Sequence, residues 1–211
     1  CMVGQKLSEI LPDDKAFSLN TYSYSSMKPF FAIKQSVFPF DKFSGIDIIL
    51  GPEMRSTGEV MGIAKRFGEA FAKGQLGIGI PIPTGGKAFL SVRDEDKPGI
   101  PEIARQLREL GFELIATQGT AKVLDAAGIL CQTVNKVWEG RPNIVDLIIN
   151  NEIAFIVNTS KGQKSSTDSS SMRRQAILHK VNYTTTLAGA RAACLALRYR
   201  NEITPVKLQE L

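Results

Sequence analysis

The chain has 211 residues, with 26 Lys and Arg against 21 Asp and Glu, and a formal net charge of +5. Its length suits one domain with an appendage or two small domains, and an apolar content of 43% is enough for a packed core. No apolar stretch reaches the ~18 residues of a membrane span, and no dense basic run with interleaved aromatic residues indicates nucleic-acid binding. We therefore expect binding to neither membrane nor nucleic acid, and a modest preference for small anions.

The first 76 residues show no repeated alternation of strands and helices. Apolar residues at helical spacing, among them Val60 and Phe67, predict one helix over Ser56–Leu76. Glycine and proline recur through residues 77–86, which predicts a linker, because both residue types disfavour a helix and a central strand. These patterns predict three parts, namely residues 1–76, the linker 77–86 and residues 87–211.

From residue 87 onwards, predicted strands and helices alternate regularly. The predicted strands are Lys87–Val92, Phe112–Thr117, Ile129–Val134, Ile153–Asn158 and Val181–Tyr183. The predicted helices are Pro101–Leu110, Thr120–Ala127, Pro142–Asn150, Ser170–Leu178 and Thr186–Arg198. This alternation predicts an α/β fold with a five-stranded parallel sheet and helices on both faces.

Hydroxyl, amide and lysine side chains follow four of the predicted strands. These groups are Lys97, Thr117–Thr120, Asn135-Lys136 and Asn158–Ser160. Sheets of this kind bind ligands at the carboxyl ends of their strands, where a residue such as Gly119 lets the backbone approach a ligand and a helix start favours an anion. Lys97 and Lys136 add charge-assisted hydrogen bonds, so we predict a phosphate site. In the alternative interpretation, Thr117 and Thr120 only cap a helix and the lysines are solvated.

Three cysteines, Cys1, Cys131 and Cys194, lie far apart without a CxxC pair, and the chain has one histidine, His179. This set does not predict a zinc site. Cys131 and Cys194 lie in apolar runs, which indicates reduced thiols in a core and a cytoplasmic protein. The chain begins with Cys-Met in mid-pattern, and we interpret it as a piece of a longer polypeptide.

Several segments resemble, in order, the carboxy-terminal regulatory domain of bacterial carbamoyl-phosphate synthase, which has a methylglyoxal-synthase-like fold. They are KAFLSVRDEDK (Lys87–Lys97), TQGTAK (Thr117–Lys122), VNKVWEGRP (Val134–Pro142), IVNTS (Ile156–Ser160), MRR (Met172–Arg174) and KVNYTTT (Lys180–Thr186). Upstream, VFPF (Val37–Phe40) and GPEMRSTGEVMG (Gly51–Gly62) resemble the end of the carbamoyl-phosphate-forming ATP-grasp half of the same enzyme. The resemblance covers essentially the whole chain, and GPEMRSTGEVMG together with VNKVWEGRP is its most specific part.

The resemblance implies the C-terminal part of a large subunit whose enzyme makes carbamoyl phosphate for pyrimidine and arginine biosynthesis. Such an enzyme uses bicarbonate, ATP with Mg or Mn, and ammonia that a glutaminase small subunit releases from glutamine. The ATP and metal ligands of such enzymes lie upstream of the position of Cys1, so we predict no catalytic and no metal-binding residue in this chain. We expect the chain to be catalytically incomplete without the remainder of the large subunit, and the whole enzyme to be an oligomer.

In bacterial relatives this regulatory domain binds uridine monophosphate (UMP) or inosine monophosphate (IMP). The matching motifs imply an effector site formed by Ser91, Lys97, Thr117, Gly119, Thr120, Lys136, Asn158, Thr159 and Ser160. Relatives often have a second threonine where this chain has Ser160, which keeps the hydroxyl group. The serine-rich segment Ser165–Ser171 is interpreted either as a mobile loop over the nucleotide or as a flexible connector.

The resemblance also implies a second effector site, for ornithine, at Tyr183 and Thr185. Relatives commonly have glutamate where this chain has Gln35, and this departure weakens the assignment because the ammonium groups of ornithine favour carboxylates. His179 is interpreted as a partly buried residue at a helix end, and Trp138 as a packing residue.

Three other functions compete with this interpretation. A free-standing methylglyoxal synthase-like lyase needs a carboxylate base, such as Asp94 or Asp96, and a well-placed histidine, but His179 lies elsewhere in the pattern. A purine-pathway cyclohydrolase domain shares the T-x-GTAK pattern, but its own later motifs are not found after Lys136. An interaction module with a vestigial site is the third, and the intact set of lysines and threonines argues against it.

Overall fold

The computed structural model describes residues 17–18, 21–22, 30–37, 58–160, 162–205 and 207, with no side-chain description for 17–18, 21–22 and 162–168. The chain forms two compact units, and the first comprises Cys1–Phe30 and Val206–Leu211. Its described strands are β1 (Phe17–Ser18) and β2 (Thr21–Tyr22), which pair antiparallel. The second unit, Phe31–Pro205, contains every other described element. Most of the VFPF motif and the first half of the GPEMRSTGEVMG motif lie outside the described residues.

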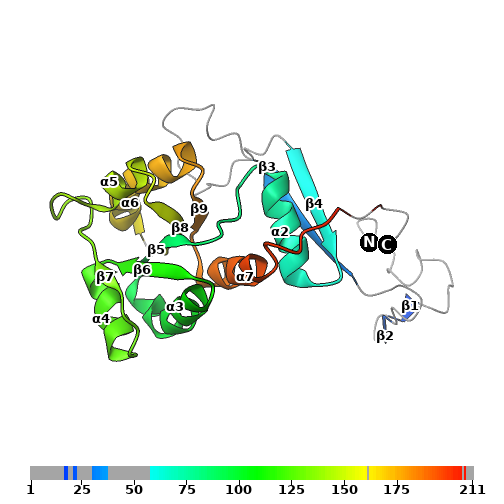
Figure 1. Ribbon diagram of the computed structural model, residues 1–211, viewed down its shortest axis with the longest axis horizontal. Coiled ribbons are helices and arrows are strands. Elements are labelled where there is room, and N and C mark those ends of the chain that lie inside the picture. The colour runs from blue at the N-terminus through cyan, green and yellow to red at the C-terminus, as the bar shows by residue number, and fades with distance from the viewer. Residues whose placement is uncertain are drawn as a thin grey trace, which may run out of the picture. The chain divides into compact units, whose positions relative to one another are not determined.

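A five-stranded parallel sheet forms the centre of the second unit (Figure 1). Its strands are β5 (Gly86–Ser91), β6 (Phe112–Ala116), β7 (Gln132–Thr133), β8 (Ile153–Asn158) and β9 (Asn182–Thr184). They lie in the order β7-β6-β5-β8-β9, and each neighbouring pair is parallel. The predicted α/β fold with five parallel strands is therefore confirmed, and the strand ends differ from the predicted ones by at most three residues.

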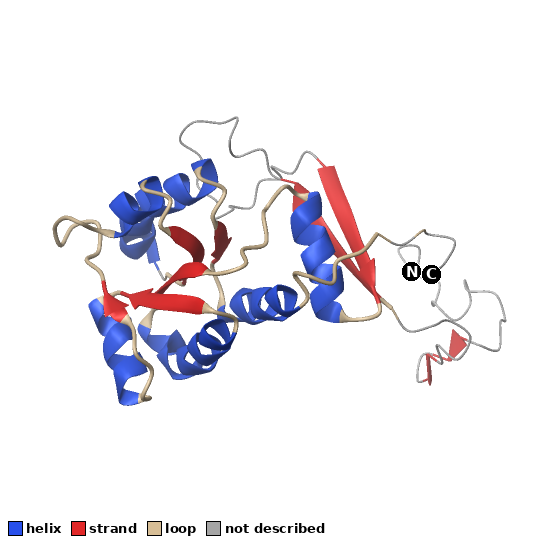
Figure 2. Ribbon diagram, in the orientation of Figure 1, coloured by secondary structure: helices blue, strands red, loops and turns tan. Residues whose placement is uncertain are grey.

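Helices cover both faces of the sheet, as Figure 2 shows. They are α3 (Ile100–Glu109), α4 (Gln118–Ala126), α5 (Ile144–Ile149), α6 (Gly162–Leu178) and α7 (Leu187–Arg198), and a 3₁₀ helix, η2 (Asp94–Gly99), precedes α3. Successive residues of a strand point to opposite faces, so Ala88 and Leu90 join a core with α3, α4 and α7. Phe89 joins the second core, with α5 and α6, and the helices on both faces are therefore also confirmed.

The predicted helix over Ser56–Leu76 is wrong in its first half. Residues Gly58–Ala64 form β4, which pairs antiparallel with β3 (Phe31–Val37), and only Phe67–Gly77 forms a helix, α2. Apolar residues four apart, such as Val60 and Ala64, fit both one helix face and one strand face, so their spacing alone does not decide. Pairing with β3, which is distant in the sequence, selects the strand.

The serine-rich segment is helical, so its interpretation as a loop or connector is wrong. Ser165–Ser171 lies within α6. The C-terminal half of α6 is held in the second core by Met172 and Ala176, which are both buried. Tertiary packing of this kind outweighs the weak helix propensity of serine.

Helix α2 packs directly against α7. A Cβ atom at Gly68 of α2 would lie 2.5 Å from the main-chain oxygen of Leu195 in α7. At the start of α2, the Arg66 guanidinium lies 5.4 Å from the centre of the Tyr199 ring and 3.5 Å from the Glu202 carboxylate. The second unit therefore includes β3, β4 and α2 as well as the sheet, and the division of the chain at residues 77–86 stays a prediction.

The two described cysteines differ in their surroundings. Cys194 in α7 is fully buried in the first core, and this burial raises the pKa of its thiol to about 12. Cys131 is half-buried against the same core, and burial raises the pKa of its thiol as well. Across the part of the chain that the structure describes, no helix has the length and apolar character needed to cross a membrane.

Candidate functional site

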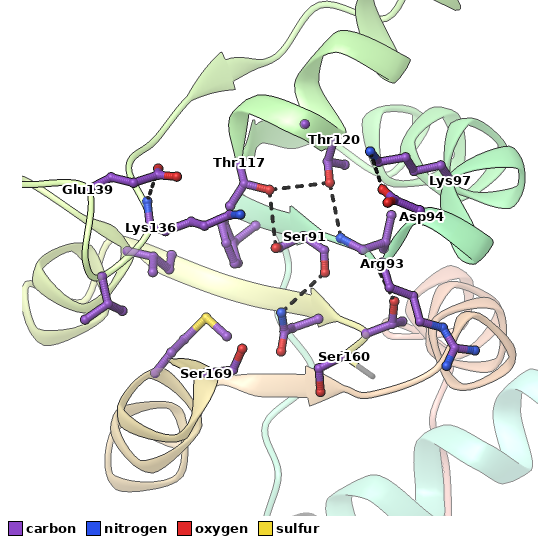
Figure 3. A pocket seen from close by; sticks show the side chains of 18 of the residues that line it. Ser91, Arg93, Asp94, Lys97, Thr117, Thr120, Lys136, Glu139, Ser160 and Ser169 are labelled. Atoms are coloured by element: carbon purple, nitrogen blue, oxygen red, sulfur yellow. Dashed lines mark hydrogen bonds and ion pairs between the residues drawn. The ribbon is translucent and has the colours of Figure 1, made fainter. Parts of the chain in front are cut away.

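A cavity of about 500 Å³ opens at the carboxyl ends of β5, β6 and β8. All nine predicted effector residues line it, and they are Ser91, Lys97, Thr117, Gly119, Thr120, Lys136, Asn158, Thr159 and Ser160. They come from segments as far apart in the sequence as η2 and the end of β8, which Figure 3 shows facing a common space. The structure thus brings the predicted residues together in one cavity.

Three hydroxyl groups are linked at the end of β5. The Thr117 Oγ1 lies 3.3 Å from the Ser91 Oγ and 3.4 Å from the Thr120 Oγ1 (Figure 3). The main-chain N–H of Val92 donates to the Thr120 Oγ1 at 3.1 Å, within a buried environment. Thr120 is therefore no helix cap, because its oxygen serves the adjoining strand end and lies inside the first turn of α4. The Thr120 oxygen also accepts from the Thr117 hydroxyl, so the Thr120 hydroxyl proton remains available to a ligand.

The start of α4 has no side-chain cap and lies beside the ammonium group of Lys97. Thr117 holds the N-cap position, but its side chain makes no capping hydrogen bond. A Cβ atom on Gly119 would lie 3.6 Å from the Lys97 Nζ, so the ammonium group stands over the first turn of the helix. The Lys97 Nζ also pairs with the Asp94 Oδ1 at 2.6 Å. A positive helix end beside an ammonium group favours a negatively charged ligand.

Lys136 approaches the cavity from the side opposite Lys97 (Figure 3). Its main-chain N–H donates to the Glu139 Oε2 at 2.8 Å, and the main-chain N–H of Glu139 donates to the Lys136 carbonyl at 3.0 Å. These bonds close a turn over residues 136–139 and leave the side chain of Lys136 to reach towards Ser91 and Thr117 (Figure 3). Two ammonium groups on opposite sides suit a doubly charged phosphate.

The end of β8 completes the wall of the cavity. The Asn158 side chain donates to the Ser91 carbonyl at 3.3 Å and accepts a hydrogen bond from the Tyr183 hydroxyl at 2.7 Å. The main-chain N–H of Arg93 donates to the Thr159 Oγ1 at 3.1 Å. Tyr183 and Ser91 thus fix the amide of Asn158, while the Thr159 hydroxyl keeps its proton for a ligand.

The residues predicted for the ornithine site do not line the cavity, in contrast to those predicted for the nucleotide site. Tyr183 bonds Asn158 at the cavity wall, but Thr185 is exposed and outside the cavity lining. Gln35 lies on β3, where its Oε1 accepts a hydrogen bond from the Gln75 side chain at 3.2 Å. The ornithine assignment stays a prediction.

His179 and the acidic residues of the described chain offer no metal centre. The His179 Nδ1 lies 2.9 Å from the Asn151 Oδ1, and His179 is absent from the cavity lining. Within the described ranges, no three His, Cys, Asp or Glu side chains form a group that would hold a metal ion.

Comparison with known proteins finds a family match over part of the chain. Residues 99–185 match the family model described as the MGS-like domain. This chain contains an MGS-like domain. The match includes α3 to β9, and residues 86–98, with β5 and Lys97, precede it.

The relatives of the chain extend beyond the MGS-like domain. The chain is 56% identical over 182 residues to a carbamoyl phosphate synthase large chain of Pseudomonas putida, covering 86% of this chain and 17% of the relative. It is 50% identical over 210 residues to that of Pseudomonas aeruginosa (100% and 19%), and 48% over 198 residues to that of Myxococcus xanthus (93% and 17%). The resemblance inferred from the motifs is therefore confirmed, and the chain spans about a fifth of the length of the curated relatives it matches.

The cavity of the MGS-like domain also has lining residues that sequence reasoning missed. Arg93, Trp138, Glu139 and Met172 belong to it. The interpretation of Trp138 as a packing residue is wrong, because 77% of its surface is exposed. One feature of the sequence indicates that Trp138 belongs to the site: it lies two residues after Lys136, in a loop that follows a predicted strand.

We expect Thr120→Val to lower both the stability of the MGS-like domain and its affinity for anions. Valine fills the space of threonine but leaves the buried N–H of Val92 without its acceptor, which costs about 1–2 kcal/mol. Urea denaturation measures the change in the free energy of unfolding. Thr120→Ser, which keeps the hydroxyl, is the control. Equal stability of the Val variant and the wild type would contradict this role of Thr120.

Proposed function

We propose that this chain is the C-terminal section of a carbamoyl-phosphate synthase large subunit, whose MGS-like domain binds UMP or IMP and thereby regulates synthesis. The observation that supports this proposal most is the single cavity that contains all nine motif-matched residues, with Lys97 and Lys136 on opposite sides. The kinship with carbamoyl phosphate synthase large chains supports the enzyme to which the domain belongs.

In this proposal the phosphate of the nucleotide lies at the start of α4. The Lys97 ammonium, the main-chain N–H groups near Gly119 and the hydroxyls of Thr117 and Thr120 surround that position. The ribose faces the end of β8, where Asn158, Thr159 and Ser160 offer amide and hydroxyl groups. Lys136 closes the site from the opposite side.

The whole enzyme then makes carbamoyl phosphate from ATP, bicarbonate and glutamine-derived ammonia, in the cytoplasm. ATP with Mg or Mn is bound by the remainder of the large subunit, and a glutaminase small subunit supplies ammonia to the oligomer. Residues 1–76 represent the tail of the second ATP-grasp domain, and 77–86 link it to the allosteric domain, 87–211. The nucleotide therefore acts at a distance, with a coupling free energy of about 1–3 kcal/mol.

A methylglyoxal synthase-like lyase is less well supported by the geometry. Asp94 lines the cavity and is available as a base, but the Asp94 carboxylate pairs with Lys97. The histidine that this reaction needs is not at the cavity, because His179 is bonded to Asn151.

We expect the purified chain to bind UMP or IMP and to make no carbamoyl phosphate. The motif residues of the effector site are present, whereas the ATP site is proposed to lie in the remainder of the large subunit. Calorimetric titration with UMP, IMP and adenosine monophosphate measures binding, and a coupled assay with ATP, bicarbonate and ammonia measures synthesis. The absence of binding for all three nucleotides would refute the effector site, and synthesis by this chain alone would refute the division of labour.

A further inference from the structure

Trp138 exposes a large aromatic surface at the cavity. Its exposed fraction is 77%, although tryptophan is among the residues that folding buries most on average. The side chain lines the same cavity as Lys136, two residues earlier in the chain. Trp138 is the single tryptophan of the chain, so its emission reports on this one position.

The turn that carries Trp138 is closed by two hydrogen bonds between Lys136 and Glu139. Lys136 and Glu139 exchange bonds of 2.8 Å and 3.0 Å, as described above. A few residues later, the Asn143 side chain accepts from the main-chain N–H of Val145 at 2.9 Å and caps α5. The indole is therefore presented by a fixed turn, which lowers the entropy lost when a ligand contacts it.

The wall of the cavity next to this turn is apolar. Phe89, Ile144 and Met172 line the cavity and are at the same time members of the second core. Val137, beside Trp138, packs against that core and also lines the cavity. The hydroxyl groups belong to the ends of β5 and β8 and to the start of α4, whereas Lys97 belongs to η2 and Lys136 to the turn after β7. The cavity therefore has a polar, charged part and an apolar part. A ligand that fits both parts carries an anionic group and a flat apolar ring.

We propose that Trp138 stacks on the aromatic base of the nucleotide and is the residue through which the site distinguishes a nucleoside monophosphate from a simple sugar phosphate. This inference rests on the proposed function, since it assigns the base to the apolar part of the same cavity. Stacking of a base on an aromatic side chain is sequence-tolerant, because every base has a π-face. It strengthens binding between about fivefold and about 150-fold.

The experiment compares ligands that share the phosphate but differ in the base. IMP, UMP and ribose 5-phosphate are titrated into the chain, and indole emission is excited at the red edge, where nucleotides do not absorb. We expect both nucleotides to quench Trp138 and ribose 5-phosphate to leave its emission unchanged. Calorimetry then compares Trp138→Leu, Trp138→Phe and the wild type.

Trp138→Leu should weaken IMP and UMP binding at least fivefold and leave the affinity for ribose 5-phosphate as it is. Trp138→Phe, which keeps an aromatic ring, should retain most of the affinity. Leu130→Ala is the matched control, because Leu130 is 78% exposed but lies outside the cavity lining. Its ligand affinities should not change.

Three results would overturn the inference, and only the third also refutes the proposed function. Unchanged nucleotide affinity in Trp138→Leu would refute stacking while the proposed effector site stands. A nucleotide that binds no more tightly than ribose 5-phosphate would do the same. If no phosphate compound binds at all, both the stacking and the proposed function fail.

Discussion

Lys97→Ala and Lys136→Ala are each expected to raise the Kd for UMP or IMP by about 10- to 150-fold, which corresponds to about 1.5–3 kcal/mol. Both lysines line the cavity, and Figure 3 shows them on opposite sides of it. Each loss removes a charged donor to the phosphate, so the affinity for ribose 5-phosphate should fall by a similar factor.

The two lysines should differ in one respect. The Lys97 Nζ pairs with the Asp94 carboxylate at 2.6 Å, so Lys97→Ala also leaves a negative charge beside the phosphate. Asp94→Asn in the same chain should restore part of the affinity, whereas it should not rescue Lys136→Ala. Half-exposed and exposed lysines contribute little to folding, so the free energy of unfolding should change by less than about 0.5 kcal/mol.

Lys122→Ala is the control for the lysine variants. Lys122 is exposed on α4 but lies outside the cavity lining, so its removal changes the net charge equally without touching the site. Calorimetry on Lys97→Ala, Lys136→Ala and Lys122→Ala separates a local contact from a general charge effect. An equal loss in Lys122→Ala would show that only the overall charge attracts the ligand, and full affinity in both cavity variants would show that the phosphate binds elsewhere.

Gly68→Val is expected to lower the free energy of unfolding by about 3 kcal/mol, at the upper end of the range for overpacked interfaces. A Cβ atom at Gly68 would lie 2.5 Å from the main-chain oxygen of Leu195 and 2.8 Å from the Tyr199 ring. Backbone cannot move aside as a flexible side chain does, so α2 and α7 must separate. Helix propensity acts in the opposite direction, by a few tenths of a kcal/mol, and does not offset the clash.

Urea denaturation and hydrogen exchange at the α2 and α7 amides measure this effect. The control is Gly58→Val, because a Cβ atom at Gly58 in β4 meets nothing within 4 Å. The control should unfold at nearly the wild-type urea concentration. Wild-type stability in Gly68→Val, with unchanged exchange in both helices, would show that α2 does not pack on α7 in solution. Nucleotide affinity should survive the change, because neither helix lines the cavity.

The sheet and the position of the candidate site followed from the sequence for local reasons. Buried parallel strands such as Ile153–Asn158 are continuous apolar runs, and their pattern does not depend on a distant partner. Parallel strands also end at a common edge, so the residues after four strands had to lie near one another. The motif resemblance then selected the family, which composition alone does not do.

The remaining features depended on contacts between distant parts of the chain. The spacing of Val60 and Ala64 fits a helix and a strand equally, and only pairing with β3 makes the segment a strand. In the sequence, a helix cap was the alternative interpretation of Thr120. In the structure, its oxygen accepts a hydrogen bond from the main-chain N–H of Val92, 28 residues earlier.

The exposure of Trp138 also depended on the tertiary structure. An aromatic residue in a loop is by default a packing residue, and only the tertiary structure leaves it at the rim of a cavity. The spacing of apolar residues and the residue types that follow each strand are local properties, which can be read from the sequence. Hydrogen-bond partners, helix contacts such as Gly68 with Leu195, and side-chain exposure arise when distant segments meet, so only the tertiary structure decides them.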